Sequence, residues 1–497
     1  MQITSSLALI SFVLALLYSC GWFFTSRGKG RGTPSALSRH DFFHTDNAGL
    51  NTISLFVATV TVASGVGYLL AGGQMNGVLM FCVPVAMLLG FRLFGYFFGH
   101  VVSPDFSRFP SFWAAAQSAV TQARGGTSHV RFILVMPLVI IFLLFSAFEL
   151  LVSAQIITAL MINSAQVWAQ VSVALGMFAC ALFLSWRGGV QAIFRTDRVQ
   201  FFGIVLFAIV LLVTMFKLRW SSEASSLPSQ SVLATKSEWL KLDGAVLLTI
   251  GLACISSIAT QFYSAINHHI ASNSTQRESQ GIALVMRRAS WMMFAFFIAM
   301  ISVGVFSGID WTKGLPTGVS AMLNQWPAGL LREVLLAISV VGLTCITLST
   351  LDSLMIAVTL QLHDGVFGLD SHNKENNPAA LAQIRRIMLI SFGGVMLLAL
   401  PAFFIKPNVF YTLLAIAAGA EVLVPLVILI GMLSRRPNSM RVLSNPRLWV
   451  YGVLFVVAIV LNLSLATHAP SWVPFGSLAC LSLSSAYSMM LWLLSKK

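Results

Sequence analysis

Residues 58–73 read ATVTVASGVGYLLAGG, and residues 247–269 read LLTIGLACISSIATQFYSAINHH. Each stretch belongs to a long apolar run, but each run is interrupted. The first holds four glycines, and the second is dense in Ser, Thr, Gln, Tyr and Asn. Two disrupted spans at matching places in two halves of a chain point to a midplane binding site between inverted repeats. Close helix packing, which also uses glycine in membranes, is the other explanation of the first stretch.

The composition places the rest of the chain in a bilayer. Of the 497 residues, 57% are hydrophobic and only 9% are charged, and the mean hydropathy is +0.85. A soluble domain carries roughly 25% charged residues, so lipid must cover most of this surface. The apolar runs lack the alternation of a β-barrel, and backbone groups cannot stay unpaired in hydrocarbon. We therefore expect an all-α polytopic membrane protein.

About 20 apolar residues are needed to cross the bilayer, and thirteen runs meet this requirement. The first run is not preceded by the basic residues of a signal peptide, so we expect it to be a permanent span. The thirteen expected spans lie near residues 6–24, 50–73, 76–100, 130–162, 166–186, 199–218, 243–268, 287–309, 332–362, 385–405, 409–434, 448–466 and 473–494.

The basic residues predict the orientation. If the N-terminus is outside, 22 of the 30 Lys and Arg residues fall in cytoplasmic segments and 7 in external loops, with Arg92 inside a span. This asymmetry follows the positive-inside rule. We therefore expect a multi-pass inner-membrane protein whose C-terminus, with Lys496 and Lys497, is cytoplasmic. The net charge of +14 comes from short clusters between apolar runs, which does not indicate a nucleic-acid partner.

The run near residues 332–362 contains the densest group of polar residues, in the string LTCITLSTLDSLM. Ser349, Asp352 and Ser353 are spaced i, i+3 and i+4, so they share one helix face. Thr350 is adjacent to that face. Neutral and anionic oxygens together suit a hard cation. Hydroxyl groups can instead bond to carbonyls of their own helix, but that explanation does not account for Asp352.

Three other acids lie within or at the edge of expected spans. Asp197 begins the sixth, and a surface ion pair with the neighbouring Arg residues would explain it. Glu149, four residues before Ser153, could contact a solute, pair with Arg92 or stay protonated. Glu421 in the eleventh span is equally open. A charge within a span costs about 2.5–3.5 kcal/mol on insertion scales, so each of these acids is a candidate functional residue.

Enzymatic chemistry is not indicated. The sequence contains no phosphate-binding loop, dinucleotide-binding fingerprint, zinc-protease motif or nucleophile elbow. The six cysteines show no CxxC spacing, so neither a disulfide framework nor a zinc site is expected. His40 and His44 have metal-ligand spacing but no third ligand nearby. We therefore expect no enzyme and no transition-metal site.

Four stretches resemble the solute:sodium symporter family, which has the leucine-transporter-type five-plus-five inverted repeat. Residues 186–200, WRGGVQAIFRTDRVQ, resemble its Gly-Gly-x-x-Ala-x-x-x-Thr-Asp-x-x-Gln signature, and residues 349–353, STLDS, resemble its eighth core helix. Residues 40–64, HDFFHTDNAGLNTISLFVATVTVAS, resemble its first core helix, and residues 148–161, FELLVSAQIITALM, its third. The resemblance implies an extra helix and loop over residues 1–48, repeats over 49–218 and 219–434, and two C-terminal helices over 435–497.

The resemblance also implies ligands. A sodium site would use carbonyls of Val62, Gly65 and Ile346 and hydroxyls of Ser349 and Thr350. A second sodium or its exit path would involve Asp197, Asp352 and Ser353. Solute would lie near the breaks in the second and seventh spans, with Ser64, Glu149, Gln261, Tyr263 and Glu421 as candidates. The chain departs from the family at Ser64, where some members carry an acid, and at residues 264–272, where many show a Gln-Arg pair.

The expected function is sodium-coupled symport of a small polar solute across the lipid bilayer by alternating access, with Na+ as the coupling ion. Two alternatives remain. A proton-coupled transporter or channel of the same fold would use Glu149, Asp197 and Asp352, and a membrane sensor could be built on a transporter scaffold. The identity of the solute and the oligomeric state are not encoded in recognisable motifs.

Overall fold

The computed structural model describes residues 5–25, 53, 56–57, 63–102, 120, 130–162, 166–220, 244–263, 279–311, 315–366, 378–405 and 409–496. Every regular element within these ranges is helical, and they contain no strand. This confirms the expected all-α class. Helices satisfy their own backbone hydrogen bonds, which is what a chain immersed in hydrocarbon requires.

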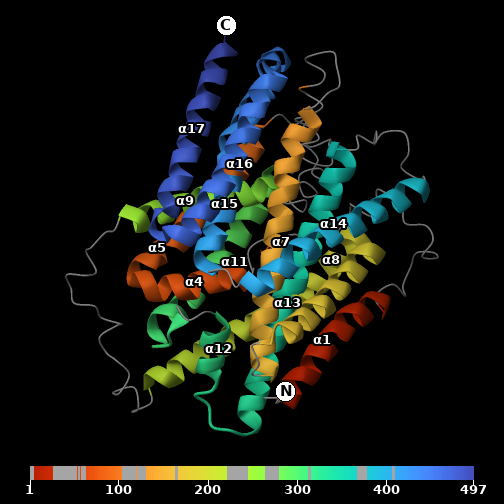
Figure 1. Ribbon diagram of the computed structural model, residues 1–497, viewed down its shortest axis with the longest axis vertical. Helices are drawn as coiled ribbons and strands as arrows, with labels where there is room; N and C mark the ends of the chain where they lie inside the picture. Colours follow the sequence, from red (N-terminus) through yellow and green to blue (C-terminus); the bar gives the residue numbers. More distant parts are fainter. Residues whose placement is uncertain are drawn as a thin grey trace.

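The helices follow the apolar runs of the sequence (Figure 1). They are α1 (Ser6–Thr25), α4 (Ala63–Asn76), α5 (Cys82–His100), α7 (Val130–Ile162), α8 (Val167–Trp220), α9 (Gly244–Tyr263), α11 (Ser279–Phe306), α12 (Leu315–Leu323), α13 (Leu330–Leu360), α14 (Pro378–Ile405), α15 (Val409–Leu433), α16 (Asn445–His468) and α17 (Val473–Leu494). A turn of 3-10 helix over Gly77–Phe81 joins α4 to α5, and a π-helical turn over Gln361–Val366 follows α13.

Ten helical segments of the described chain are long and apolar enough to cross a membrane. Two shorter apolar helices, Ser6–Cys20 and Leu247–Ala259, coincide with the first and seventh expected spans. The second expected span begins at residue 50, but most of residues 50–62 lie outside the described ranges. A multi-pass membrane protein is therefore confirmed, while the count of thirteen spans stays a prediction.

The junction between the fifth and sixth expected spans differs from the expectation of a loop over residues 187–198. Helix α8 continues from Val167 to Trp220, and the one residue with non-helical backbone angles is Gly189, at φ 54° and ψ −147°. Glycine adopts positive φ without the steric cost that other residues meet. The Gly188–Gly189 pair therefore turns the chain within one residue, and the helix resumes immediately.

Two groups of helices form the body of the protein (Figure 1). In the first, α5 packs against α9 and α11, and α11 packs against α4. In the second, α13 packs against α7, α8 and α14. A Cβ atom on Gly90 of α5 would lie 2.3 Å from the carbonyl oxygen of Cys254 in α9, so glycine permits this close approach. Each group unites helices that lie far apart in the sequence.

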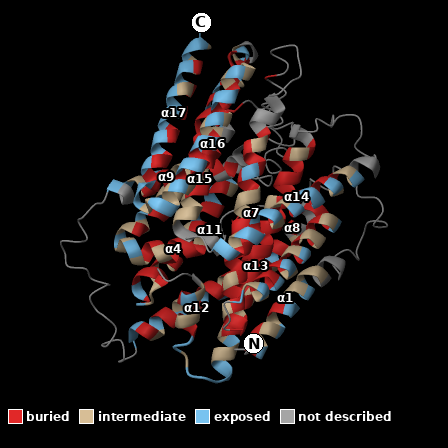
Figure 2. Cartoon of the chain, in the orientation of Figure 1, coloured by how far each residue is buried: buried red, intermediate tan, exposed pale blue. Residues whose placement is uncertain are grey.

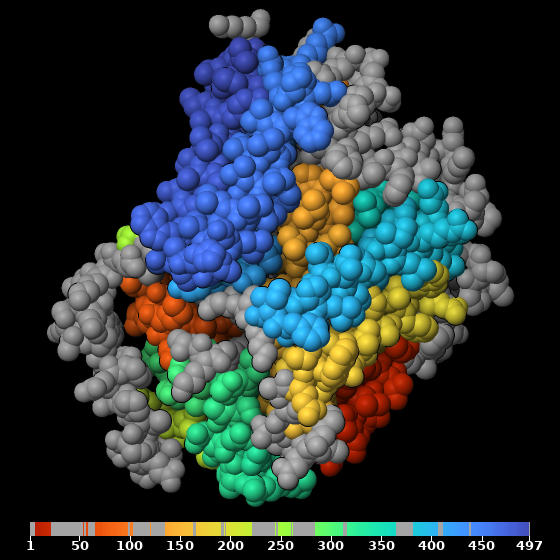
Figure 3. Space-filling view, in the orientation of Figure 1, coloured from red at the N-terminus to blue at the C-terminus, as the bar shows by residue number. Residues whose placement is uncertain are grey.

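The remaining helices surround these groups. Helix α1 lies against α13 and α8, and α15 connects the first group, through α9 and α4, to α16 and α17. Figure 2 shows that buried residues are concentrated on α7 and α13, whereas α16 and α17 expose much of their surface. The exposed residues there are largely apolar, including Val460, Met489 and Leu493. Figure 3 shows α16 and α17 as one ridge along the edge of the molecule, as expected of a lipid-facing pair.

Candidate ion and solute sites

The polar face of α13 is completely buried. Ile346 and Ser349 are 0% exposed and Thr350 is 1% exposed. The Thr350 hydroxyl donates a hydrogen bond to the carbonyl oxygen of Ile346 at 2.9 Å, which brings two expected sodium ligands together. The Ser349 hydroxyl has no hydrogen-bond partner within the described part of the chain. Bonding to the helix's own carbonyls therefore explains Thr350 but not Ser349.

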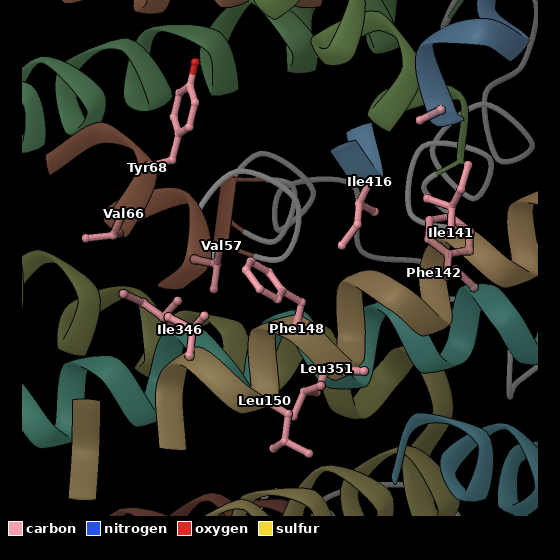
Figure 4. Packing of buried hydrophobic residues seen from close by; sticks show 14 of the residues in the cluster. Val57, Val66, Tyr68, Ile141, Phe142, Phe148, Leu150, Ile346, Leu351 and Ile416 are labelled. Carbon is pink, nitrogen blue, oxygen red and sulfur yellow. The ribbon is translucent and has the colours of Figure 1, made fainter. Parts of the chain in front are cut away.

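The other expected sodium ligands are in the second span. Gly65 is half-buried near the start of α4, and α4 contacts α13. Val62 lies outside the described residues. Figure 4 shows Val57 and Val66 in the same part of the core as Ile346. Phe56, which precedes Val57, makes edge-to-face contacts with Phe201 of α8 and Phe296 of α11, so this segment lies between the two helix groups.

Helices α8 and α13 run antiparallel, and their contacts define the register. A Cβ atom on Gly203 would lie 2.8 Å from the Cys345 Sγ, and one on Gly342 would lie 2.4 Å from the Phe207 Cβ. Continuing this register toward the N-terminus of α8 places Gln200 level with Ser349, and Asp197 level with Asp352. The two carboxyl groups are close enough to interact electrostatically.

The ion-pair explanation required Asp197 to lie at the surface, but the structure buries it. Its side chain is 0% exposed, as is that of Asp352. Its neighbour Arg195 is half-buried, and Arg198 is exposed. The loop expected over residues 187–198 would have left Asp197 in solvent. The sharp turn at Gly189 instead begins the helix early and presses this part of α8 against α13.

Several buried polar atoms at the α8–α13 interface have no hydrogen-bond partner among the described residues. The Ser353 hydroxyl lies 3.4 Å from Oδ1 of Asp352, while Oδ2 of Asp352 accepts no hydrogen bond from any described residue. The amide of Gln200, which is 1% exposed, likewise has no described partner at either atom. Buried polar groups are rarely left unsatisfied, so this interface is suited to a bound ion or water.

Gln200 is a candidate that the sequence did not single out. It follows Asp197 by three residues and therefore lies on the same face of α8. Gln200 belongs to the string TDRVQ, but nothing in that string indicates that Gln200 lies level with Ser349. The contact between two helices about 150 residues apart supplies that information.

Glu421 lies where α15 meets α4 and α9. It is 2% exposed, and its Oε1 accepts a hydrogen bond from the hydroxyl of Ser256 in α9. Tyr68 of α4 is close enough to interact electrostatically with it. The second oxygen, Oε2, has no hydrogen-bond partner among the residues placed by the structure. Neither Ser256 nor Tyr68 was a candidate from the sequence.

The other solute candidates are only partly described. Glu149 is 1% exposed on α7, and Ser153, one turn later, receives a hydrogen bond from Thr347 of α13 at 2.6 Å. Gln261 is 0% exposed near the end of α9. The side chains of Ser64 and Tyr263 lie outside the described set.

Arg92 was a possible partner of Glu149, and His40 and His44 had the spacing of metal ligands. Arg92 is exposed on α5, where its guanidinium carbon lies 5.3 Å from the ring centroid of Trp291. Its described contact is therefore with an aromatic ring rather than with Glu149. His40 and His44 lie outside the described residues. The described ranges contain no group of three His, Cys, Asp or Glu residues arranged to hold a metal ion.

This architecture is similar to that of two solved transporters. One is a Na+-coupled sialic acid symporter in a substrate-bound outward-open state that reveals a novel Na+ site; the TM-score is 0.62 at 12% identity, over 98% of this chain and 97% of that chain. The other is MhsT in complex with L-phenylalanine, with a TM-score of 0.50 at 14% identity, over 94% of this chain and 100% of that chain. The chain therefore has the expected leucine-transporter-type fold.

No protein-family model matches the chain, and no curated protein matches it in sequence. The fold is thus established by structure, while the boundaries of the two repeats stay a prediction.

Proposed function

We propose that this protein is a secondary active transporter that couples the entry of sodium to the uptake of a small polar solute by alternating access. The observation that carries the proposal is the polar α8–α13 interface, where Ser349, Asp352 and Gln200 keep buried atoms without described partners. This interface lies inside a fold shared with a Na+-coupled symporter. A bound cation would satisfy these oxygens, which otherwise remain desolvated at a cost in free energy.

The first sodium would be held between α4 and α13. Its ligands are the carbonyl oxygens of Val62, Gly65 and Ile346 and the hydroxyl oxygens of Ser349 and Thr350. The buried Ser349 hydroxyl, which has no described partner, supports this assignment. The Thr350 hydroxyl oxygen and the Ile346 carbonyl oxygen lie 2.9 Å apart. A sodium ion bound to both oxygens would replace this hydrogen bond, with the hydroxyl proton turned away from Ile346.

A second sodium, or the first one on its way to the cytoplasm, would be held by Asp197, Asp352 and Ser353, with Gln200 as a further ligand. Two buried carboxylates at close range repel each other in a medium of low dielectric constant. A cation between them removes that repulsion. The site therefore favours a positively charged occupant, which supports ion coupling over the sensor alternative.

Sodium would supply enough free energy for accumulation. One ion that crosses 100 mV gains about 2.3 kcal/mol, and a tenfold sodium gradient adds about 1.4 kcal/mol. Together these terms sustain an accumulation of roughly several hundred-fold for a neutral solute at one-to-one coupling. The proton-coupled alternative would use the same carboxylates, and it predicts that transport does not depend on sodium.

The proposed orientation has the N-terminus outside and the C-terminus in the cytoplasm of a cell with an inner membrane. Single cysteines at Gln230 and Lys313, in loops proposed to be external, should react with an impermeant maleimide added to intact cells. A cysteine at Arg441 should not. Met440 is a poorer choice because its side chain is 0% exposed, whereas Arg441 is exposed. Labelling of Arg441→Cys from outside would contradict this orientation.

A further inference from the structure

Glu421 is directed away from the outer helices. On the adjoining turn of α15, Gly419 packs against Ile459 of α16, and the carbonyl oxygen of Val422 accepts a hydrogen bond from Ser484 of α17 at 2.6 Å. The Glu421 side chain extends instead to Ser256 of α9. The acid therefore points from the peripheral layer into the space where α4, α9 and α15 converge.

That convergence is distinct from the proposed ion sites. The proposed ion ligands lie on α13, on α8 and at the start of α4, whereas the described neighbours of Glu421 are Ser256 of α9 and Tyr68 of α4. Figure 4 shows Tyr68 projecting from α4 on the opposite side from Ile346 of α13. Glu421 interacts electrostatically with Tyr68. It also lies beside the two interrupted spans, where solute is expected.

The carboxylate of Glu421 has unused capacity for a cation. An ionised carboxylate accepts up to about four hydrogen bonds. Among the described residues, Ser256 alone donates a hydrogen bond to the Glu421 carboxylate. No Lys or Arg in the described ranges is within ion-pair distance of it, and the nearby polar groups are hydroxyls. A buried carboxylate without a positive partner is strongly disfavoured. A cation supplied by the solute would remove this cost.

The geometry points to a positively charged nitrogen of the transported solute as that partner, bound by Glu421, Ser256 and Tyr68. The inference rests on the proposed function and names its substrate class: small amines or ammonium compounds, including zwitterionic amino acids. A protonated amine would donate a charge-assisted hydrogen bond to Oε2 of Glu421. A quaternary ammonium group, which has no N–H, would make an ion contact with the same carboxylate. The hydroxyl of Tyr68, which is close enough to interact electrostatically with Glu421, would accept a further hydrogen bond from the same nitrogen.

The test is thermal stabilisation of the purified full-length protein in detergent with saturating sodium. The probes are primary amines, amino acids and quaternary ammonium compounds, each paired with an isostere that replaces the nitrogen: 1,4-diaminobutane with 1,4-butanediol, L-alanine with L-lactate, and choline with 3,3-dimethyl-1-butanol. We expect at least one amine to raise the melting temperature and its isostere to have no effect. A response to none of the amines, or an equal response to the isostere, would overturn the inference.

Substitutions link the response to Glu421. Glu421→Gln keeps the size of the side chain and can still accept from Ser256, so we expect it to weaken amine binding at least tenfold while leaving the response to sodium intact. Ser256→Ala should weaken binding severalfold, and Glu421→Asp should retain part of it. Glu333→Gln is the matched control, because Glu333 also accepts from a serine hydroxyl, that of Ser5, but lies at the start of α13.

Other outcomes are also informative. Unchanged amine binding in Glu421→Gln or in Ser256→Ala would overturn the assignment. A Glu421→Gln variant that changed only the pH dependence of amine binding would also overturn it, since Glu421 would then be a proton site. If Glu421→Gln does not fold, Ser256→Ala and Glu421→Asp decide the question. Sodium stabilisation without solute separates the two hypotheses: if sodium stabilises the protein but amines do not, this inference fails and the proposed function stands.

Discussion

Replacing both Ser349 and Thr350 by Ala is expected to weaken sodium binding at least about tenfold, because the proposed first ion loses two oxygen ligands. An interaction with a charged group contributes about 1.5–3 kcal/mol, and about 1.4 kcal/mol is a factor of ten in affinity. A ligand stabilises the folded state in proportion to the logarithm of its concentration above its dissociation constant. The rise in melting temperature with sodium should therefore shift to higher concentrations in the double variant.

A matched control is available on the same helix. Ser339 and Thr359 are both 0% exposed, and their hydroxyls donate to the carbonyl oxygens of Leu335 and Met355 of α13. Ser339→Ala with Thr359→Ala removes the same two side-chain types from buried positions away from the site. This control should lose some stability but keep the sodium response of the parent. An equal sodium response in the Ser349→Ala, Thr350→Ala variant would place the ion elsewhere.

Asp197→Asn and Asp352→Asn should each raise the melting temperature without sodium and reduce the additional stabilisation that sodium provides. In sodium-free buffer, each substitution removes one of two acidic groups that are both 0% exposed and whose ionised forms repel each other, so the melting temperature is expected to rise. With sodium present, the stabilisation should be smaller than in the parent and its concentration dependence less steep, because a charged ligand is lost. Transport should slow in correctly folded protein.

A purely structural role predicts a different pattern. If Asp352 only fixed helix packing through its contact with Ser353, Asp352→Asn would lower the melting temperature equally with and without sodium. Asp310→Asn serves as the control, since Asp310 is half-buried and accepts a hydrogen bond from Gln74 at 3.4 Å, away from α8 and α13. Wild-type sodium dependence in both acid variants would exclude the second ion site and the exit path.

The spans that the sequence predicted best are those with long, uniform apolar runs. The expected span at 130–162 coincides with α7 (Val130–Ile162), and that at 409–434 with α15 (Val409–Leu433). The sharp turn at Gly189 was not predicted, because the basic residues around it read as a loop between two spans. Helix α12 was also missed, since its nine residues are too few to register as a span.

The candidate sites were predicted in part. The polar face of α13 could be identified because its residues follow one another at helical spacing within a single run. The grouping of Gln200 with Ser349, and of Glu421 with Ser256 and Tyr68, could not. These groupings bring together helices about 150 residues or more apart, and local periodicity carries no information about which faces of two distant helices meet.

Uptake into proteoliposomes under separately imposed gradients tests the central claim most directly. The solute is the compound that stabilises the purified protein in sodium, and accumulation is measured with an inward sodium gradient, an inward proton gradient, or potassium in place of sodium at equal ionic strength. We predict accumulation above equilibrium with the sodium gradient alone, increased by a potential that is negative inside. Accumulation driven by the proton gradient without sodium, or equilibration at the same rate in potassium, would contradict sodium-coupled symport.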